Sequence, residues 1–437
     1  MVASLAVVAI GTMGATEVCS TSIWTTTART IPTISGLAPL SFEVWYVTVM
    51  AVTSVHGEKE SWSILTLCVE NIYRPKRQVS GNAWERGFGY SREWISTPKT
   101  YNDLWDRIIS FQNIYEAYTR ARRGKRFQGE VLRFERRLEE NIITLQNELV
   151  WRTWEPSRSS QFYVYEPKQR LITAPAFRDR VIHHSLVENI EPLFERKFID
   201  RSFACRVGRG THASHECVVK TLRKFNRKHK KTWILQADIS KYFASINHDI
   251  LLSIIKRTIR DRRALWLIDK IVRNSGFDCV GLPVGALTSQ LFANVYLDQL
   301  DHFMTDNLGY GNYIRYMDDT LLFSDSREEL ERLREAIEGF VTARLSLRLN
   351  PKTRIYPASQ GIDFCGYRTW STHSLPRKRN VSRVRKRLKR LSALVRGGTR
   401  DIETLRQVWA SFLGYMKHCS GMMTVRAAGR EMKIKST

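Results

Sequence analysis

The chain has 437 residues, of which 43% are hydrophobic and 11% aromatic, a globular composition that excludes a largely disordered protein. The 69 Lys and Arg residues against 43 Asp and Glu give a formal net charge of +26. This excess predicts a polyanionic partner, with nucleic acid first and ribosome-like assemblies or anionic membranes as alternatives. The scattered cysteines form no C-x-x-C pair, which argues against zinc or disulfides and fits a reducing cytoplasm.

The first 100 residues differ in composition from the rest of the chain. Residues 1–57 are rich in Thr, Ser, Val and Ala and carry almost no charge. We expect residues 1–100 to be an extension of unknown role, poorly ordered in part, either an upstream extension of the reading frame or an extra domain. The sequence contains no run of 18 apolar residues, so no membrane span is predicted. A short apolar run lies at residues 2–15, but the first basic residue is Arg29. The basic residues that precede the apolar run of a secretory signal are therefore missing.

An ordered domain is expected to begin at Tyr101. Apolar residues recur at helical spacing over 104–118, behind a cap at Asn102. We also expect a helix over 130–151 and two strands, over 162–165 and 170–174.

Three aspartates carry the clearest chemical signal. Asp318 and Asp319 lie between two apolar, β-prone runs, a pattern that predicts a hairpin with both carboxylates at its tip. Taken alone, the pair could be an ordinary exposed turn. However, Asp238 ends the apolar stretch 233–237, so a second strand brings a third carboxylate. Three such groups can clamp two Mg²⁺ ions for nucleotidyl transfer.

Five segments then resemble the motifs of the retroviral, group II intron and retroelement reverse transcriptases, over residues 101–436. In chain order they are Asp238-Ile239-Ser240-Lys241-Tyr242-Phe243 (motif A), Gly281-Leu282-Pro283-Val284-Gly285 with Ser289-Gln290 (motif B), Tyr316-Met317-Asp318-Asp319 (motif C), Leu349-Asn350-Pro351-Lys352-Thr353 (motif D) and Ile362-Asp363-Phe364-Cys365-Gly366-Tyr367 (the primer grip). The resemblance implies an α+β right-hand polymerase. We expect N-terminal helices and fingers over 101–232, a palm of antiparallel sheet with packed helices over 233–368, which includes part of the fingers, and a small helical thumb over 369–437.

The resemblance also implies roles for the residues at the reaction centre. Asp238, Asp318, Asp319 and the backbone carbonyl of Ile239 would hold two Mg²⁺ ions, with Mn²⁺ as a substitute. Lys352 would protonate the leaving pyrophosphate; a solvated surface lysine is the alternative.

For the incoming deoxynucleoside triphosphate, the resemblance makes Phe243 a steric gate against the ribose 2′-hydroxyl. A plain core role is the alternative for this ring. The other nucleotide-binding residues that it implies are Lys168, Arg170, Gly285 and Gln290.

Contacts with template RNA and with a DNA or cDNA primer are implied at several further positions. They are Arg206, Arg209, Tyr316, Met317, Gly366, Arg383, Arg387 and Arg390. The last three lie on a predicted thumb helix that has no acidic residue between Pro376 and Arg396. Because its like charges repel, this helix needs an outside anion. It ends at Gly397-Gly398 and a second helix follows over 402–416.

Within the family, Leu287-Thr288-Ser289-Gln290-Leu291-Phe292-Ala293-Asn294 looks like the diversity-generating retroelements. This resemblance implies a cytoplasmic bacterial or phage enzyme that copies a template-repeat RNA with errors at adenines and works with a small basic accessory protein, without a membrane partner. The alternatives are a group II intron maturase-like enzyme, a defence-associated reverse transcriptase, and a catalytically silent RNA-binding scaffold. The stretch after Tyr367 is expected to hold the thumb and no RNase H or endonuclease domain.

Overall fold

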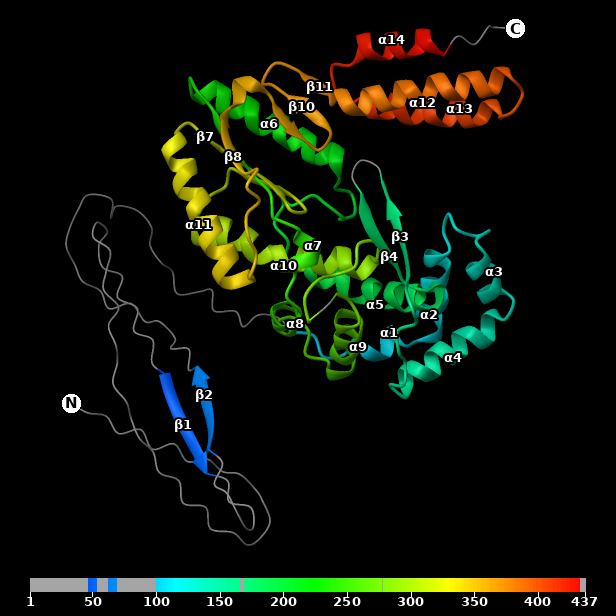
Figure 1. Cartoon of the computed structure of the whole chain (residues 1–437), viewed down its shortest axis with the longest axis vertical. Helices are drawn as coiled ribbons and strands as arrows, with labels where there is room; N and C mark the ends of the chain where they lie inside the picture. Colours follow the sequence, from blue (N-terminus) through cyan, green and yellow to red (C-terminus); the bar gives the residue numbers. More distant parts are fainter. Residues whose placement is uncertain (1–45, 53–61, 69–99, 166–168, 277, 433–437) are drawn as a thin grey trace, which may run out of the picture. The chain divides into compact units, whose positions relative to one another are not determined.

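The computed structural model describes residues 46–52, 62–68, 100–165, 169–276 and 278–432 (Figure 1). The chain divides into two compact units, Met1–Arg92 and Glu93–Thr437. In the first unit, β1 (Tyr46–Val52) pairs antiparallel with β2 (Trp62–Cys68). The rest of the predicted N-terminal extension, and the disorder expected in it, lies outside the described residues.

The second unit begins with four short helices. They are α1 (Trp105–Ile108), α2 (Phe111–Ala121), α3 (Gly129–Glu135) and α4 (Leu138–Val150). The predicted helix over 104–118 is therefore two helices, and the predicted cap at Asn102 is wrong. The Asp261 carboxylate instead accepts bonds from the backbone nitrogens of Leu104 and Trp105, at 3.0 and 2.9 Å, and Ser110 caps α2 by accepting from Asn113 N.

The predicted helix over 130–151 is also divided. Arg137, with φ −134° and ψ 54°, has no helical conformation and separates α3 from α4. Both predicted strands that follow are confirmed, as β3 (Ser160–Val164) and β4 (Arg170–Ala174), which form an antiparallel hairpin. Two long helices come next, α5 (Phe177–Glu195) and α6 (Thr211–Lys228).

A four-stranded antiparallel sheet with the order β6-β7-β5-β8 forms the predicted palm. Its strands are β5 (Trp233–Ala237), β6 (Tyr313–Tyr316), β7 (Asp319–Ser324) and β8 (Arg354–Pro357). The helices between and after them are α7 (Tyr242–Ser245), α8 (His248–Lys256), α9 (Arg262–Arg273), α10 (Leu287–His302), the π-helix η1 (Phe303–Asn307), α11 (Arg327–Leu345) and the 3₁₀ turn η2 (Ala358–Gln360). The predicted α+β class is confirmed.

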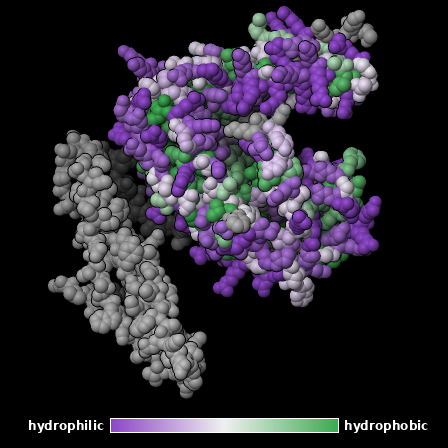
Figure 2. Space-filling model, viewed as in Figure 1, coloured by the Kyte–Doolittle hydropathy of each residue, from purple (hydrophilic) through white to green (hydrophobic). Residues whose placement is uncertain are grey.

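A smaller sheet leads into the C-terminal helices. Its strands are β9 (Ile362–Phe364), β10 (Tyr367–Thr369) and β11 (Ser374–Pro376), in the order β11-β10-β9. The helices are α12 (Lys378–Arg396), α13 (Ile402–Met416) and α14 (Met422–Glu431). The first two confirm the predicted thumb helices, whereas α14 was not predicted. Figure 2 shows mainly hydrophilic residues over this helical group, at the upper right of the view.

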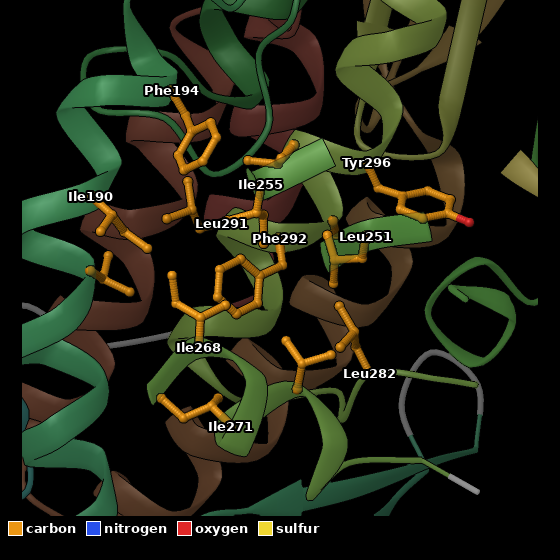
Figure 3. Packing of buried hydrophobic residues seen from close by; sticks show 14 of the residues in the cluster. Ile190, Phe194, Leu251, Ile255, Ile268, Ile271, Leu282, Leu291, Phe292 and Tyr296 are labelled. Atoms are coloured by element: carbon orange, nitrogen blue, oxygen red, sulfur yellow. The ribbon is translucent and has the colours of Figure 1, made fainter. Parts of the chain in front are cut away.

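The core lies where α5, α8, α9 and α10 meet. Phe292 of α10 is fully buried and lies among Ile190, Leu251 and Ile268, each from a different helix (Figure 3). Nearly every face of α10 is covered, which explains why its sequence lacks a clear polar stripe. This packing fixes α10 beneath the strands that carry the aspartates. Among the described residues, no helix is long and apolar enough to cross a membrane.

Candidate active site

Strand register brings the three predicted aspartates to one edge of the main sheet. β5 and β7 are antiparallel with Ala237 opposite Thr320. Asp238, which follows Ala237, therefore lies beside Asp319, which precedes Thr320. Tyr316 pairs with Asp319, so Met317 and Asp318 form the two-residue turn of the β6–β7 hairpin. The predicted hairpin with carboxylates at its tip is confirmed.

The turn of this hairpin is strained. Met317 has φ +56°, in the first central position of the turn, where glycine is the usual residue. A side chain at positive φ costs on the order of 1–3 kcal/mol and persists only where the surroundings hold it. The surroundings of this turn must therefore stabilise it.

Buried negative charge dominates the electrostatics of this edge. The pKa of Asp319 is raised to about 7, first by burial and then by the charges of Asp318 and Asp238. The pKa of Asp318 is also raised, first by burial and further by Asp238, while Arg170 lowers it. Carboxylates that repel one another in this way are stabilised by a bound cation.

The donor set fits magnesium, because carboxylate and carbonyl oxygens are the hard ligands that this ion prefers. Ile239 is buried and forms a bridge with Leu349. Among the described residues, however, no three His, Cys, Asp or Glu side chains converge closely enough to hold an ion together. The metal site therefore stays a prediction, supported by strand register and charge.

Asn350 holds Asp238 in place. Its Nδ2 donates to Asp238 Oδ2 at 2.8 Å, and its backbone nitrogen donates to the Asp238 carbonyl at 2.7 Å. The Asn350 side chain also accepts from the backbone nitrogen of Lys352 at 3.0 Å. Lys352 itself is exposed, so its general-acid role stays a prediction. Asparagine in motif D was visible in the sequence, but no local pattern indicated its partner.

Phe243 lines a cavity of about 1120 Å³, which Gly281 and Ser289 also line. Its ring is partly buried and packs edge-to-face on Tyr242, with centroids 5.6 Å apart. This position is compatible with both the gate and the core interpretations. Gln290 is exposed on α10.

Gly285 joins motif B to the β3–β4 hairpin. It has φ +120°, and a Cβ there would lie 3.0 Å from Ile172 Cγ2. The adjacent carbonyl of Val284 accepts from Thr173 N at 3.2 Å. Glycine is thus required here for the hairpin to approach. Arg170 is exposed at the start of β4, whereas Lys168 lies outside the described residues.

The predicted nucleic-acid contact of Arg206 is wrong. Its side chain is only 3% exposed and pairs with Glu195 at 2.8 Å. Its Nη1 also donates to the carbonyls of Ile199 and Ser202, at 2.6 and 2.7 Å. The guanidinium therefore fixes the loop after α5. Arg209 is partly exposed and pairs with Asp200 at 2.9 Å, and its role stays a prediction.

Several other predicted contacts lie at the junction between sheet and thumb. Tyr316 is half-buried, edge-to-face with Phe364. Gly366 has φ +90° and accepts from Arg377 N at 2.8 Å and from the Tyr415 hydroxyl. On α12, the exposed residues Arg383, Arg387 and Arg390 share one face through their i, i+4, i+7 spacing. Arg383 and Arg387 line a groove of about 600 Å³ against α13.

A buried arginine that the motif analysis missed supports the hairpin. Arg315 donates to both oxygens of Asp301, at 2.7 and 2.6 Å, and both side chains are fully buried. Its Nη1 also donates to the Met317 carbonyl at 3.0 Å. An arginine inside an apolar strand run was the available signal, because burial of such a group requires a partner.

Comparison with known proteins agrees with this geometry. Residues 164–369 match the family model described as "Reverse transcriptase (RNA-dependent DNA polymerase)". Protein YkfC of Escherichia coli K12 is 25% identical over 274 residues, which cover 53% of this chain and 72% of YkfC. Group II intron-encoded protein LtrA of Lactococcus lactis is 28% identical over 177 residues, which cover 38% of this chain and 28% of LtrA. The chain thus spans less than a third of LtrA.

Among solved structures, apo telomerase from Candida tropicalis aligns with a TM-score of 0.40 and 11% identity, over 64% of this chain and 63% of the telomerase chain. The segment that matches the family model contains Asp238, Asp318 and Asp319 together with the strands that align them. Residues 164–369 therefore resemble the reverse transcriptase family, and part of the chain is similar to group II intron-encoded proteins.

Proposed function

We propose that this chain copies RNA into DNA by metal-dependent nucleotidyl transfer. The observation that carries the proposal is the register that aligns Asp238 with Asp319 beside the Asp318 turn, within a reverse transcriptase domain. These carboxylates, with the Ile239 carbonyl, would hold two Mg²⁺ ions. Bound there, such ions supply an activated 3′-hydroxyl and charge stabilisation for the leaving pyrophosphate.

The residues around this edge suit a deoxynucleoside triphosphate. Arg170 is exposed at the start of β4 and lowers the pKa of Asp318, and its guanidinium would bind triphosphate oxygens. Phe243 would exclude a ribose 2′-hydroxyl. Lys352, whose backbone nitrogen donates to the side chain of Asn350, would donate a proton to pyrophosphate. Lys168, Gly285 and Gln290 complete the proposed nucleotide site.

The direct test is deoxynucleotide incorporation on a primed RNA template with Mg²⁺, using wild type and Asp319→Asn. We expect the variant to lose at least about 100-fold in rate, because removal of an electrostatic group at the reacting centre costs on the order of 3 kcal/mol. Asp325→Asn is the matched control, since Asp325 directly follows the other end of β7 and pairs with His229 at 2.8 Å. Equal activity in Asp319→Asn and wild type would overturn the proposal.

We further propose that the enzyme serves a diversity-generating retroelement, copying a template-repeat RNA with errors at adenines and with a small basic accessory protein. Support comes from the run Leu287–Asn294 of α10, which includes Ser289-Gln290. Sequencing of the products tests this, because the proposal requires errors concentrated opposite template adenines. Uniformly faithful copying would contradict it.

A maturase-like function is the second candidate. The observation that favours it is the similarity to LtrA and to nuclear intron maturase 1 of Arabidopsis thaliana, the latter 30% identical over 101 residues, 23% of this chain and 13% of the maturase. This candidate predicts that the chain promotes splicing of an intron RNA and copies adenines faithfully. The same product sequencing, with a splicing assay, separates the two candidates.

A further inference from the structure

A second cationic surface lies outside the proposed reaction centre. No acidic residue occurs between Glu216 and Asp238, the stretch that forms most of α6 and the loop to β5. The inner side of α6 buries Val218, Leu222 and Phe225 against the main sheet. Its outer side and the loop expose six basic residues, called here the α6 cationic face: Arg223, Lys224, Arg227, Lys228, Lys230 and Lys231.

The charges of this face are not neutralised within the described part of the chain. Glu216 pairs with Lys220 at 2.7 Å, and Asp325 pairs with His229 at 2.8 Å. None of the six residues of the face has an ion-pair partner among the described residues. Like charges spaced i, i+4 along α6 repel one another. An external polyanion would relieve this repulsion.

A recess of about 260 Å³ lies at one end of the face. Lys230 and Lys231 line it together with Asn226, Ser371 and Trp370. Trp370 is fixed there, because its Nε1 donates to the Ser359 carbonyl at 3.1 Å. The recess thus combines cationic, amide and hydroxyl groups with a rigid aromatic wall. Figure 2 shows mainly hydrophilic residues over the region of α6.

This surface is separate from the reaction centre. Trp233 lines the recess and begins β5, whereas Ala237 ends β5 next to Asp238. Four residue steps of a strand span about 13 Å, at roughly 3.3 Å per residue. The recess and the aspartates therefore lie at opposite ends of the same strand.

We propose that the α6 cationic face and its recess bind a segment of RNA that is not being copied. This inference rests on the proposed function, in which RNA is already the template. RNA suits the face better than a protein does, because protein interfaces are depleted in lysine and need an apolar centre, which this face lacks. Interfaces with nucleic acid are polar and strongly cationic.

The test compares the full chain with the triple variant Lys224→Gln, Lys228→Gln and Lys231→Gln. Binding of an unprimed 20-nucleotide uridine RNA is measured across salt concentrations. We expect weaker binding and a salt slope reduced by about 2, since each phosphate contact with a single strand contributes roughly 0.7. The matched control removes the same charge from exposed positions of α11, as Arg332→Gln, Arg334→Gln and Arg344→Gln, where glutamates are interspersed.

A second measurement separates this inference from the proposed function. Incorporation on a short primed template should be unchanged in the lysine triple variant. The inference would be overturned if the lysine triple variant bound RNA as tightly as the α11 control does. It would also be overturned if the lysine triple variant lost binding to polyglutamate, an acidic peptide, and still bound RNA. Failure of the wild type to synthesise DNA would instead overturn the proposed function, whatever the binding result.

Discussion

The guanidinium of Arg315 and the carboxylate of Asp301 form a fully buried, bidentate ion pair beneath the hairpin that carries Asp318. Tyr313 donates to the same carboxylate at 2.9 Å, and Asn294 accepts from Arg315 at 3.2 Å. The Nη1 group of Arg315 also donates a hydrogen bond to the Met317 carbonyl. The pair therefore links α10 to the strained turn and offsets the cost of its positive φ.

We predict that Arg315→Leu destabilises the fold by about 3–5 kcal/mol, because it leaves the Asp301 charge buried and unpaired. The double variant Arg315→Leu with Asp301→Leu should recover most of that loss, as measured by urea unfolding. It should not recover the polymerisation rate, because the Met317 carbonyl still lacks its donor. Full activity in the double variant would show that the ion pair serves stability alone.

The elements that the sequence predicts correctly are those whose signal is local. The strand Trp233–Ala237 and the β6–β7 hairpin follow from apolar runs bounded by aspartates, and the register of antiparallel strands then fixes which residues meet. The thumb helix α12 follows from apolar residues at helical spacing.

The errors arise where a distant residue decides the outcome. Arg206 turns inward because Glu195 lies 11 residues earlier and local carbonyls accept its donors. The start of α1 depends on Asp261, which accepts from Trp105 N from 156 residues away, and the start of α2 depends on Ser110. Neither interaction leaves a periodic trace in the sequence. The partnership of Arg315 with Asp301 was hidden for the same reason.

Gly285 provides a test of the contact between motif B and the fingers hairpin. Gly285→Ala places a Cβ 3.0 Å from Ile172 at a φ of +120°, so we expect a cost of about 1–3 kcal/mol and a raised KM for deoxynucleotides. Gly339→Ala is the control, because it lies within α11 with no atom within 4 Å of its added Cβ. Alanine should stabilise that helix by roughly 0.5–1 kcal/mol. An unchanged KM in Gly285→Ala would contradict the proposed nucleotide site.

The variant Phe243→Ala distinguishes between a role of this ring as a steric gate and a role in the core. If the ring excludes the 2′-hydroxyl, Phe243→Ala should raise the ratio of ribonucleotide to deoxynucleotide kcat/KM by roughly tenfold or more, a loss of about 1.4 kcal/mol in discrimination. Phe127→Ala is the control, since that ring is 94% exposed and lies in the turn between α2 and α3. Loss of stability in Phe243→Ala with no change in the ratio would favour the core interpretation.

His215 lies between the palm and the thumb, and its environment predicts that the stability of the fold depends on pH. Its Nε2 lies 3.1 Å from the His418 carbonyl and its ring stacks on Tyr367, with centroids 4.1 Å apart. Burial, followed by the charges of His418 and His212, lowers the pKa of His215 from 6.5 to about 4, although the bond to the His418 carbonyl opposes this shift. The unfolded chain thus binds more protons than the folded chain between these two values.

The contribution of His215 to stability should accordingly be constant above about pH 7, fall as the pH decreases through 6.5, and stop falling below about 4, with a maximum loss on the order of 3 kcal/mol. His183 and His184, whose pKa values burial also lowers to about 4, contribute in the same direction. The contribution of His215 is therefore the difference between wild type and His215→Asn in urea unfolding at pH 7.5 and pH 5. The variant should lose less stability than wild type on acidification, because one proton-binding group is gone. An equal loss in both proteins would show that the contact between His215 and His418 does not respond to pH.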